Sequence, residues 1–130
     1  MGKPGSGKST VFKLLIGLQE CPEKSIYFGN QDLTNIPLAK LRNSIAYVPT
    51  QSYLLSTTIS DNIKFGKELP MHETVEVAAK KADLYRDLGD LLNNDLHKLG
   101  EEGQDLSGGQ KQRINMARGF YKNAPYLLLD

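Results

Sequence analysis

The sequence predicts an α/β fold in which helices alternate with the strands of a parallel sheet. Its first support is the segment GKPGSGKST at residues 2–10, which satisfies G-x-x-x-x-G-K-[ST] and runs into an apolar helical segment. Two further runs, SIAYV at 44–48 and YLLL at 126–129, are rich in strand-forming residues, and helical patterns lie between them. Strands that alternate with helices in this way are typical of a parallel sheet.

The glycine-rich segment at residues 2–10 has the composition of a phosphate-binding loop. Gly5 and Gly7 carry no Cβ, so consecutive backbone N–H groups can turn inward around a polyphosphate. Lys8 would reach the β- and γ-phosphates, Ser9 would offer its hydroxyl to Mg²⁺, and the following helix would point the positive end of its dipole at the same anion. The alternative is an ordinary Gly/Ser/Lys loop without a ligand. The predicted nucleotide-binding residues of the loop are Gly2, Gly5, Ser6, Gly7, Lys8, Ser9 and Thr10.

The composition limits the classes of partner. With 130 residues, 39% of them hydrophobic, the chain is long enough for one domain with a modest core. Its 16 basic and 15 acidic residues leave a net charge of +1, which predicts no broad surface for nucleic acid or an anionic membrane. The single cysteine, Cys21, excludes an internal disulfide. No apolar run approaches the roughly 20 residues that span a bilayer.

The first half of the chain predicts two helices and two strands after the glycine-rich loop. The strongly apolar pattern at 11–18 indicates a buried helix. The run SIYF at 25–28, closed by a Gly-Asn turn signal, predicts a short strand at the edge of a sheet. A short helix is expected at 37–42, and a buried strand at 44–48. The polar residues 50–52 then follow a strand end, where a side chain could reach a bound nucleotide.

The second half of the chain reads as mainly helical. Apolar periodicity predicts a helical block from residue 58 to about 99, interrupted at Gly89 and again at residues 93–95. Ser107 and Gln110 then have the S-x-x-Q spacing of a capping box, which predicts the start of another helix. That helix is expected to break at Ala124-Pro125, before a strand at 126–129 of the fully buried type.

Four motifs now stand in one order: the glycine-rich loop, a glutamine-bearing segment after a strand, LSGGQ at 106–110, and an apolar strand that ends at Asp130. This order resembles the nucleotide-binding domain of ATP-binding cassette (ABC) proteins. TTISDNIKFG at 57–66 and GEEG at 100–103 look like segments of exporter-type cassettes. The resemblance implies a P-loop NTPase-type parallel sheet core with an inserted helical subdomain. Its expected bounds are 1–56 with 119–130 for the core, and 57–118 for the helical subdomain.

The same resemblance implies ATP and Mg²⁺ as cofactors and assigns further residues. Asp130 would hold Mg²⁺ as the aspartate of the Walker B motif, together with Ser9. Such a domain works at the cytoplasmic face of a membrane, joined to the transmembrane domain of the transporter. Two cassettes meet head to tail, and the signature segment of one would contact the γ-phosphate of the ATP bound by the other. The signature residues in this sequence are Ser107, Gly108, Gly109 and Gln110.

The glutamine segment departs from the exporter pattern. Exporters usually read Val-Pro-Gln, whereas here Thr50 stands at the expected site and Gln51 follows it. We assign Lys8 and Gln51 as catalytic residues, and Gln51 also as a metal-binding residue. The alternatives are that Thr50 takes the place of Gln51 as a shorter oxygen ligand, or that the segment is only a structural loop. GEEG at 100–103 is expected to contact a transmembrane coupling helix or the other cassette, with a solvated charged loop as the alternative.

Two expected elements of a complete cassette have no counterpart in the sequence. No apolar strand leads into the loop at Gly2, and the position expected for a catalytic glutamate would follow Asp130. The sequence therefore predicts an incomplete cassette, truncated at both ends, that hydrolyses ATP negligibly when isolated. An exporter is the favoured parent, and the alternatives are a soluble, non-transport ABC ATPase and an inactive truncated cassette.

Overall fold

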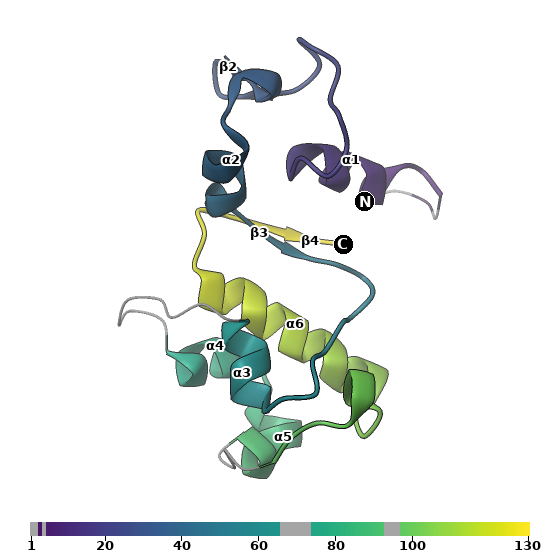
Figure 1. Cartoon of the computed structure of the whole chain (residues 1–130), viewed down its shortest axis with the longest axis vertical. Coiled ribbons are helices and arrows are strands. Elements are labelled where there is room, and N and C mark those ends of the chain that lie inside the picture. The colour runs from purple at the N-terminus through teal and green to yellow at the C-terminus, as the bar shows by residue number, and fades with distance from the viewer. Residues whose placement is uncertain (1–2, 4, 66–73, 93–96) are drawn as a thin grey trace. The chain divides into compact units, whose positions relative to one another are not determined.

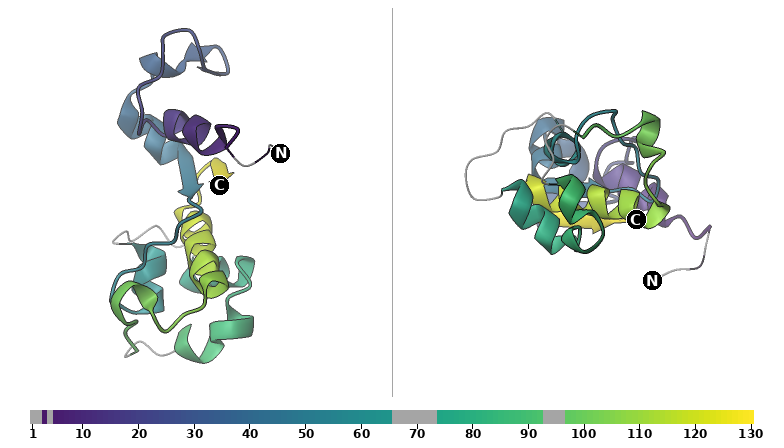
Figure 2. Two further views of the ribbon diagram at one scale, coloured as in Figure 1. Left: turned by 90° about the vertical axis from the view of Figure 1, so that its right-hand side faces the viewer. Right: turned by 90° about the horizontal axis from the view of Figure 1, so that it is seen from below.

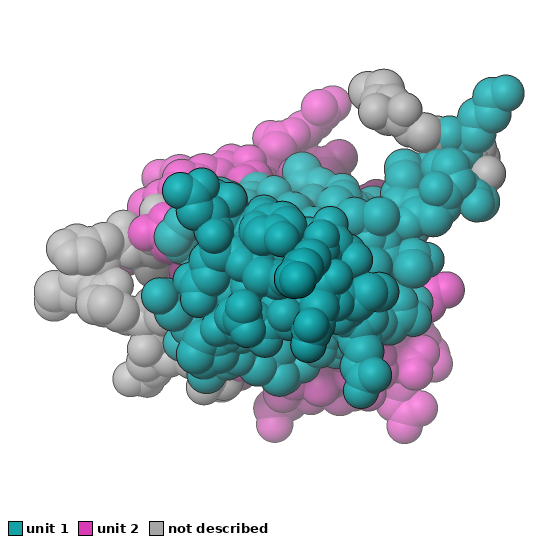
Figure 3. Space-filling view, turned by 90° about the horizontal axis from the view of Figure 1, so that it is seen from above, with its two compact units in different colours: residues 1–47, 124–130 teal, residues 48–123 magenta. Residues whose placement is uncertain are grey.

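The computed structural model describes residues 3, 5–65, 74–92 and 97–130 and has a mixed α/β fold. The chain forms two compact units, coloured separately in Figure 3. The first unit consists of Met1–Tyr47 together with Ala124–Asp130, and the second is Val48–Asn123. The domain bounds predicted from the sequence, at residues 57 and 118, differ from this division and stay a prediction.

The first unit contains a helix that follows the glycine-rich loop, a small hairpin and a pair of strands (Figure 1). The turn at Gly29, where φ is 59°, reverses the chain so that β1 pairs antiparallel with β2. The strand predicted at 25–28 is therefore present as β1, with a partner that the sequence did not indicate. The elements in chain order are α1 (Lys8–Leu15), β1 (Tyr27–Phe28), β2 (Gln31–Asp32), the 3-10 helix η1 (Leu33–Asn35), α2 (Leu38–Ser44), β3 (Ile45–Val48) and β4 (Tyr126–Leu129).

β3 and β4 form a two-stranded sheet, and their arrows point the same way in Figure 1. The core of the unit lies among Ile16, Leu33, Leu41 and Ile45, all less than 9% exposed. Two expectations of burial are wrong. No residue of α1 is buried, since its apolar pattern reaches the core only at Ile16. In β4, Tyr126, Leu127 and Leu129 are exposed, because the described part of the chain pairs β4 with β3 alone.

The second unit is helical, as the sequence predicts, and α6 lies at its centre (Figure 2). Thr58 and Thr74 cap the first two helices, each by accepting a hydrogen bond from the backbone N–H three residues later. The α3 and α4 helices pack against α6. The elements are α3 (Ile59–Lys64), α4 (Val75–Lys81), α5 (Tyr85–Leu92), the 3-10 helix η2 (Glu101–Gly103) and α6 (Gly108–Lys122).

The core of the second unit combines side chains from all four helices and the loops between them. Its fully buried members include Leu54, Ile59, Ile63, Leu84 and Ile114. The predicted interruption at Gly89 corresponds to non-helical angles at the preceding residue, inside α5. The interruption predicted at 93–95 lies outside the described residues. Within the described ranges, no helix combines the length and the apolar character that crossing a membrane requires.

Candidate functional site

The glycine-rich loop leads directly into the N-terminus of α1. Gly5 and Gly7 have φ values of 78° and 84°, in the left-handed region that favours glycine. A Cβ at either position would meet no atom within 4 Å, so these glycines serve the backbone angles rather than a tight contact. No side chain caps α1, and Ser6, Ser9 and Thr10 are exposed around its start. The N–H groups of this helix end are thus open to an anion, whereas Gly2 lies outside the described residues.

The Lys8 side chain folds back over the loop that precedes it. Its Nζ donates to the backbone oxygen of Lys3 at 2.8 Å and lies 3.4 Å from Ser6 Oγ. The ammonium group is therefore held near the loop by a backbone oxygen and a serine hydroxyl. This is where the sequence predicts that the phosphates bind.

Asp130 meets the start of α1 although 121 residues separate it from Ser9. Ser9 Oγ donates to Asp130 Oδ1 at 2.9 Å. Tyr47, on β3, donates its hydroxyl to Asp130 Oδ2 at 3.0 Å. Burial first, and then the hydrogen bond and charge of Asp130, raise the pKa of Tyr47 above its ordinary value. The fold therefore brings together the two residues predicted to hold Mg²⁺ and adds a tyrosine beside them.

The signature segment forms the predicted capping box in the second unit. Gln110 donates its backbone N–H to Ser107 Oγ at 3.3 Å, and the Ser107 N–H donates to Gln110 Oε1 at 2.8 Å. Gly108 and Gly109 are exposed, and a Cβ on either would meet no atom within 4 Å. The first turn of α6 is therefore ordered by its own side chains and presents small residues outward. The prediction of a helix start at this point is confirmed.

The glutamine segment follows β3 and belongs to the second unit. Thr50 and Gln51 are exposed, and Leu54, three residues later, is buried in the core at 1% exposure. The glycine-rich loop and Asp130 belong to the other unit. The assignment of Gln51 rather than Thr50 to the metal-sensing role therefore stays a prediction.

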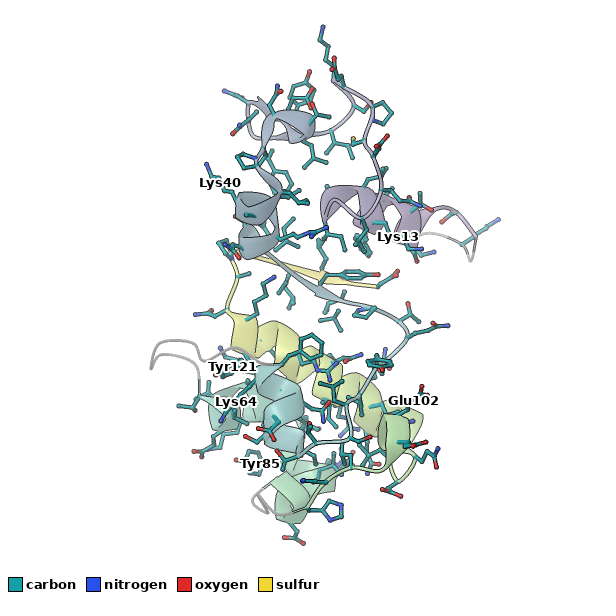
Figure 4. The ribbon with its side chains drawn as sticks, in the orientation of Figure 1. Lys13, Lys40, Lys64, Tyr85, Glu102 and Tyr121 are labelled. Carbon is teal, nitrogen blue, oxygen red and sulfur yellow. The ribbon has the colours of Figure 1, made fainter. Side chains whose placement is uncertain are left out.

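The GEEG segment at residues 100–103 packs closely against Leu54. Gly103 is buried with φ 64°, and a Cβ there would lie 2.8 Å from Leu54 Cδ1. The Gly100 N–H donates to Asp105 Oδ2 at 3.1 Å. Glu101 and Glu102 are exposed, and Figure 4 shows Glu102 projecting from the loop before α6. The two glycines shape the loop, while the two carboxylates remain available to a partner.

A polar network that the sequence did not reveal connects α3 with α6. The amide of Asn62, fully buried, bonds both the N–H and the carbonyl of Leu55 at 2.9 Å. Arg118 donates to the backbone oxygen of Asn62 at 2.6 Å and to its side-chain oxygen at 2.7 Å. It also donates to Tyr53 O and Asn115 Oδ1. The one available signal was a polar residue between two buried isoleucines of α3.

Arg118 also contacts the ring of Phe65 and remains charged at neutral pH. The guanidinium carbon lies 4.8 Å from the centroid of the Phe65 ring. Burial lowers the pKa of Arg118 to about 10, which still leaves the side chain charged at pH 7. Among the residues that the structure describes, no group of three or more His, Cys, Asp or Glu side chains is arranged to hold a metal ion.

Comparisons with known proteins agree with this geometry. A family model described as "ABC transporter" matches residues 1–130. The chain is 40% identical over 129 residues to a "Probable ABC transporter ATP-binding/permease protein" of Haemophilus influenzae, covering 99% of this chain and 23% of that protein. It is 40% identical over 130 residues to an "ATP-dependent lipid A-core flippase" of Saccharophagus degradans, covering 100% of this chain and 22% of the flippase.

A solved structure extends the similarity to three dimensions. The structure titled "Structure of a bacterial Atm1-family ABC exporter with ATP bound" matches 99% of this chain and 23% of its own, with a TM-score of 0.87 and 36% identity. The chain belongs to the ABC transporter family. It spans less than a quarter of the length of each of these three relatives.

Proposed function

We propose that this chain is part of the ATP-binding domain of an ABC exporter, in which ATP binding and hydrolysis drive substrate transport across a membrane. The observation that carries the proposal is the hydrogen bond between Ser9 and Asp130 at 2.9 Å. It joins Ser9, at the end of the glycine-rich loop, to Asp130, the acidic residue that follows β4. A helix start beside a hydroxyl and a carboxylate offers separate positions for phosphate and for cation.

The residues present fit ATP with Mg²⁺. Mg²⁺ prefers oxygen ligands and retains several waters, so Ser9 and Asp130 suffice as protein ligands, with Gln51 as a third candidate. The uncapped start of α1 offers backbone N–H groups, and the Lys8 ammonium adds a positive charge. Bound Mg²⁺ would neutralise charge on the phosphates. The proposed nucleotide-binding residues are Gly2, Gly5, Ser6, Gly7, Lys8, Ser9 and Thr10.

The signature segment suits a second nucleotide, bound by another copy. Ser107 and Gln110 satisfy each other in the capping box, so the outward groups at this helix start are backbone atoms beside Gly108 and Gly109. Close approach of a phosphate requires such small residues. We propose that these residues contact the γ-phosphate held by a partner cassette, in a head-to-tail dimer. The corresponding fold is a P-loop parallel sheet core with an inserted helical subdomain, to which this chain would contribute one part.

A transporter is favoured over a soluble ABC ATPase by the relatives, one of which is described as an ATP-binding/permease protein. The proposed location is the cytoplasmic face of a membrane, with a transmembrane domain as partner and no nucleic acid. Glu101 and Glu102 are exposed on a loop whose backbone is shaped by buried Gly103. Fixed carboxylates of this kind would suit contact with a coupling helix or with the second cassette.

Within the parent protein, these residues would act mainly through position and charge. Lys8 would hold the γ-phosphate and stabilise the charge that develops on it, and Gln51 would sense the bound Mg²⁺ and its water. The signature helix of the partner would complete the site. We therefore propose that the parent is an ATPase and that the isolated chain turns over ATP negligibly.

The proposal is tested by equilibrium binding of a fluorescent ATP analogue, trinitrophenyl-ATP, to the full-length protein that carries this chain. Lys8→Ala is expected to weaken binding at least 10-fold, because it removes the ammonium group that is proposed to reach the β- and γ-phosphates. Lys13→Ala is the matched control, since Lys13 is an exposed lysine of the same helix. Equal binding by wild type and Lys8→Ala would reject the proposed site. Turnover by the isolated chain that Lys8→Ala abolishes would reject its predicted inactivity.

A further inference from the structure

Tyr47 is a polar residue of β3 that the proposed nucleotide site does not use, and it shares a carboxylate with Ser9. Its hydroxyl donates to Asp130 Oδ2 at 3.0 Å, while Ser9 Oγ donates to Oδ1 at 2.9 Å. Both oxygens of Asp130 are therefore engaged by protein hydroxyls from different elements. The remaining lone pairs on Oδ1 and Oδ2 are left for other ligands.

The ring of Tyr47 is held by the helix that supplies Ser9. Phe12 of α1 packs against it in an edge-to-face arrangement, with the ring centroids 6.2 Å apart. Ser9 and Phe12 are three residues apart and so lie on one face of α1. A closed circuit of contacts results: Ser9 bonds Asp130, Asp130 bonds Tyr47, and Tyr47 packs on Phe12. It ties α1, β3 and β4 to one another.

This circuit restricts a side chain that would otherwise rotate. The χ2 torsion of aspartate is broad, and Asp130 directly follows β4. A single hydrogen bond from Ser9 would permit the carboxylate to swing about that bond. The second bond, from Tyr47 to the other oxygen, fixes the plane of the carboxylate and keeps Oδ1 directed at the start of α1.

We infer that Tyr47 is a positioning residue for the divalent cation of this site, acting through the hydrogen bond that orients Asp130. This inference rests on the proposed nucleotide site. Partners that orient a metal-binding carboxylate typically change metal affinity 10- to 100-fold when they are removed. Tyr47→Phe removes only the hydroxyl and keeps the ring that packs on Phe12. It should therefore weaken Mg²⁺ binding while leaving the glycine-rich loop and its phosphate contacts unchanged.

The test measures binding of trinitrophenyl-ATP to the full-length protein, first in EDTA and then over a Mg²⁺ titration. In EDTA, the affinity of Tyr47→Phe for the probe is expected to lie within about two-fold of that of wild type. Its half-maximal Mg²⁺ concentration is expected to rise about 10-fold, at the lower end of the range for such partners. Tyr27→Phe is the matched control, because Tyr27 is a 53% exposed tyrosine of the same unit. It should titrate like wild type.

Asp130→Asn separates failure of the inference from failure of the proposed function. If Mg²⁺ changes probe binding in wild type, Asp130→Asn abolishes that change and Tyr47→Phe titrates like wild type, the inference about Tyr47 is wrong and the site stands. If Mg²⁺ has no effect on wild type, the proposed site itself fails, and the inference with it.

A second variant covers the case in which Tyr47→Phe does not fold, as judged by circular dichroism. Phe12→Leu keeps the Tyr47 hydroxyl but removes the ring that braces it. A smaller rise in the half-maximal Mg²⁺ concentration is then expected. A midpoint equal to that of wild type in folded Phe12→Leu would overturn the inference.

Discussion

Arg118 is predicted to be a main source of stability in the second unit. Its guanidinium donates to the backbone oxygens of Asn62 and Tyr53 and to the side-chain oxygens of Asn62 and Asn115. These acceptors come from α3, from α6 and from the segment before α3. Arg118→Ala would release all of these contacts at once, and with them the stacking on Phe65.

The loss of stability in Arg118→Ala depends on which of these acceptors are left without a hydrogen-bond donor. Tyr53 is 62% exposed and can be rehydrated, and Asn62 Oδ1 keeps its hydrogen bond from the Leu55 N–H. Asn115, in contrast, is 4% exposed, and its Oδ1 accepts from Arg118. A buried polar group that loses its partner costs about 1–3 kcal/mol, and the exposed cation–π contact adds about 0.5–1 kcal/mol. The burial that lowers the pKa of Arg118 is itself a cost, which the substitution removes. We expect a net loss of about 3 kcal/mol in the free energy of unfolding.

The assay is urea unfolding of the chain at pH 7, followed by the helical circular dichroism signal. Arg118→Lys retains the charge but not the planar fork, so it should recover less than half of the loss, to about 2 kcal/mol below wild type. Arg86→Ala, at an exposed position of α5, is the control and should change stability by no more than about 0.5 kcal/mol. If Arg118→Ala also stays within that margin, the network does not support the unit.

Three further predictions concern single local features. Gly103→Ala should destabilise the chain by about 2 kcal/mol in the same urea assay, because a Cβ at positive φ would press on Leu54. Ser107→Ala should cost about 1 kcal/mol through loss of the α6 cap, and a loss below about 0.3 kcal/mol would contradict that account. The hydrogen bond from the Thr34 N–H is the main reason that the pKa of Asp32 lies below 3.8. The stability that the ionised Asp32 contributes to the fold is therefore complete above that pH and is lost as the pH falls through the lowered pKa. Asp32→Asn should therefore remove part of the loss of thermal stability between pH 5 and about pH 2, and an unchanged pH profile would refute this.

Local patterns accounted for much of the architecture. The capping box at Ser107 and Gln110 and the helix that follows it were readable because their partners are three residues apart. The strand at 44–48 was readable from its β-branched and aromatic composition. Burial of the strand at 126–129 was mispredicted, since an apolar run shows what a strand can bury and not which neighbours cover it.

The sequence by itself determined the family and the residues predicted to hold phosphate, because both depend on residue types at short, fixed spacings. The family resemblance already assigned Asp130 and Ser9 to one Mg²⁺, but only the tertiary structure decided that they bond directly, that Tyr47 joins them, and that Arg118 binds Asn62. Those pairs are 121, 83 and 56 residues apart. Contacts at such separations depend on how the helices and strands pack around two cores, a property of the folded chain that local periodicity does not encode.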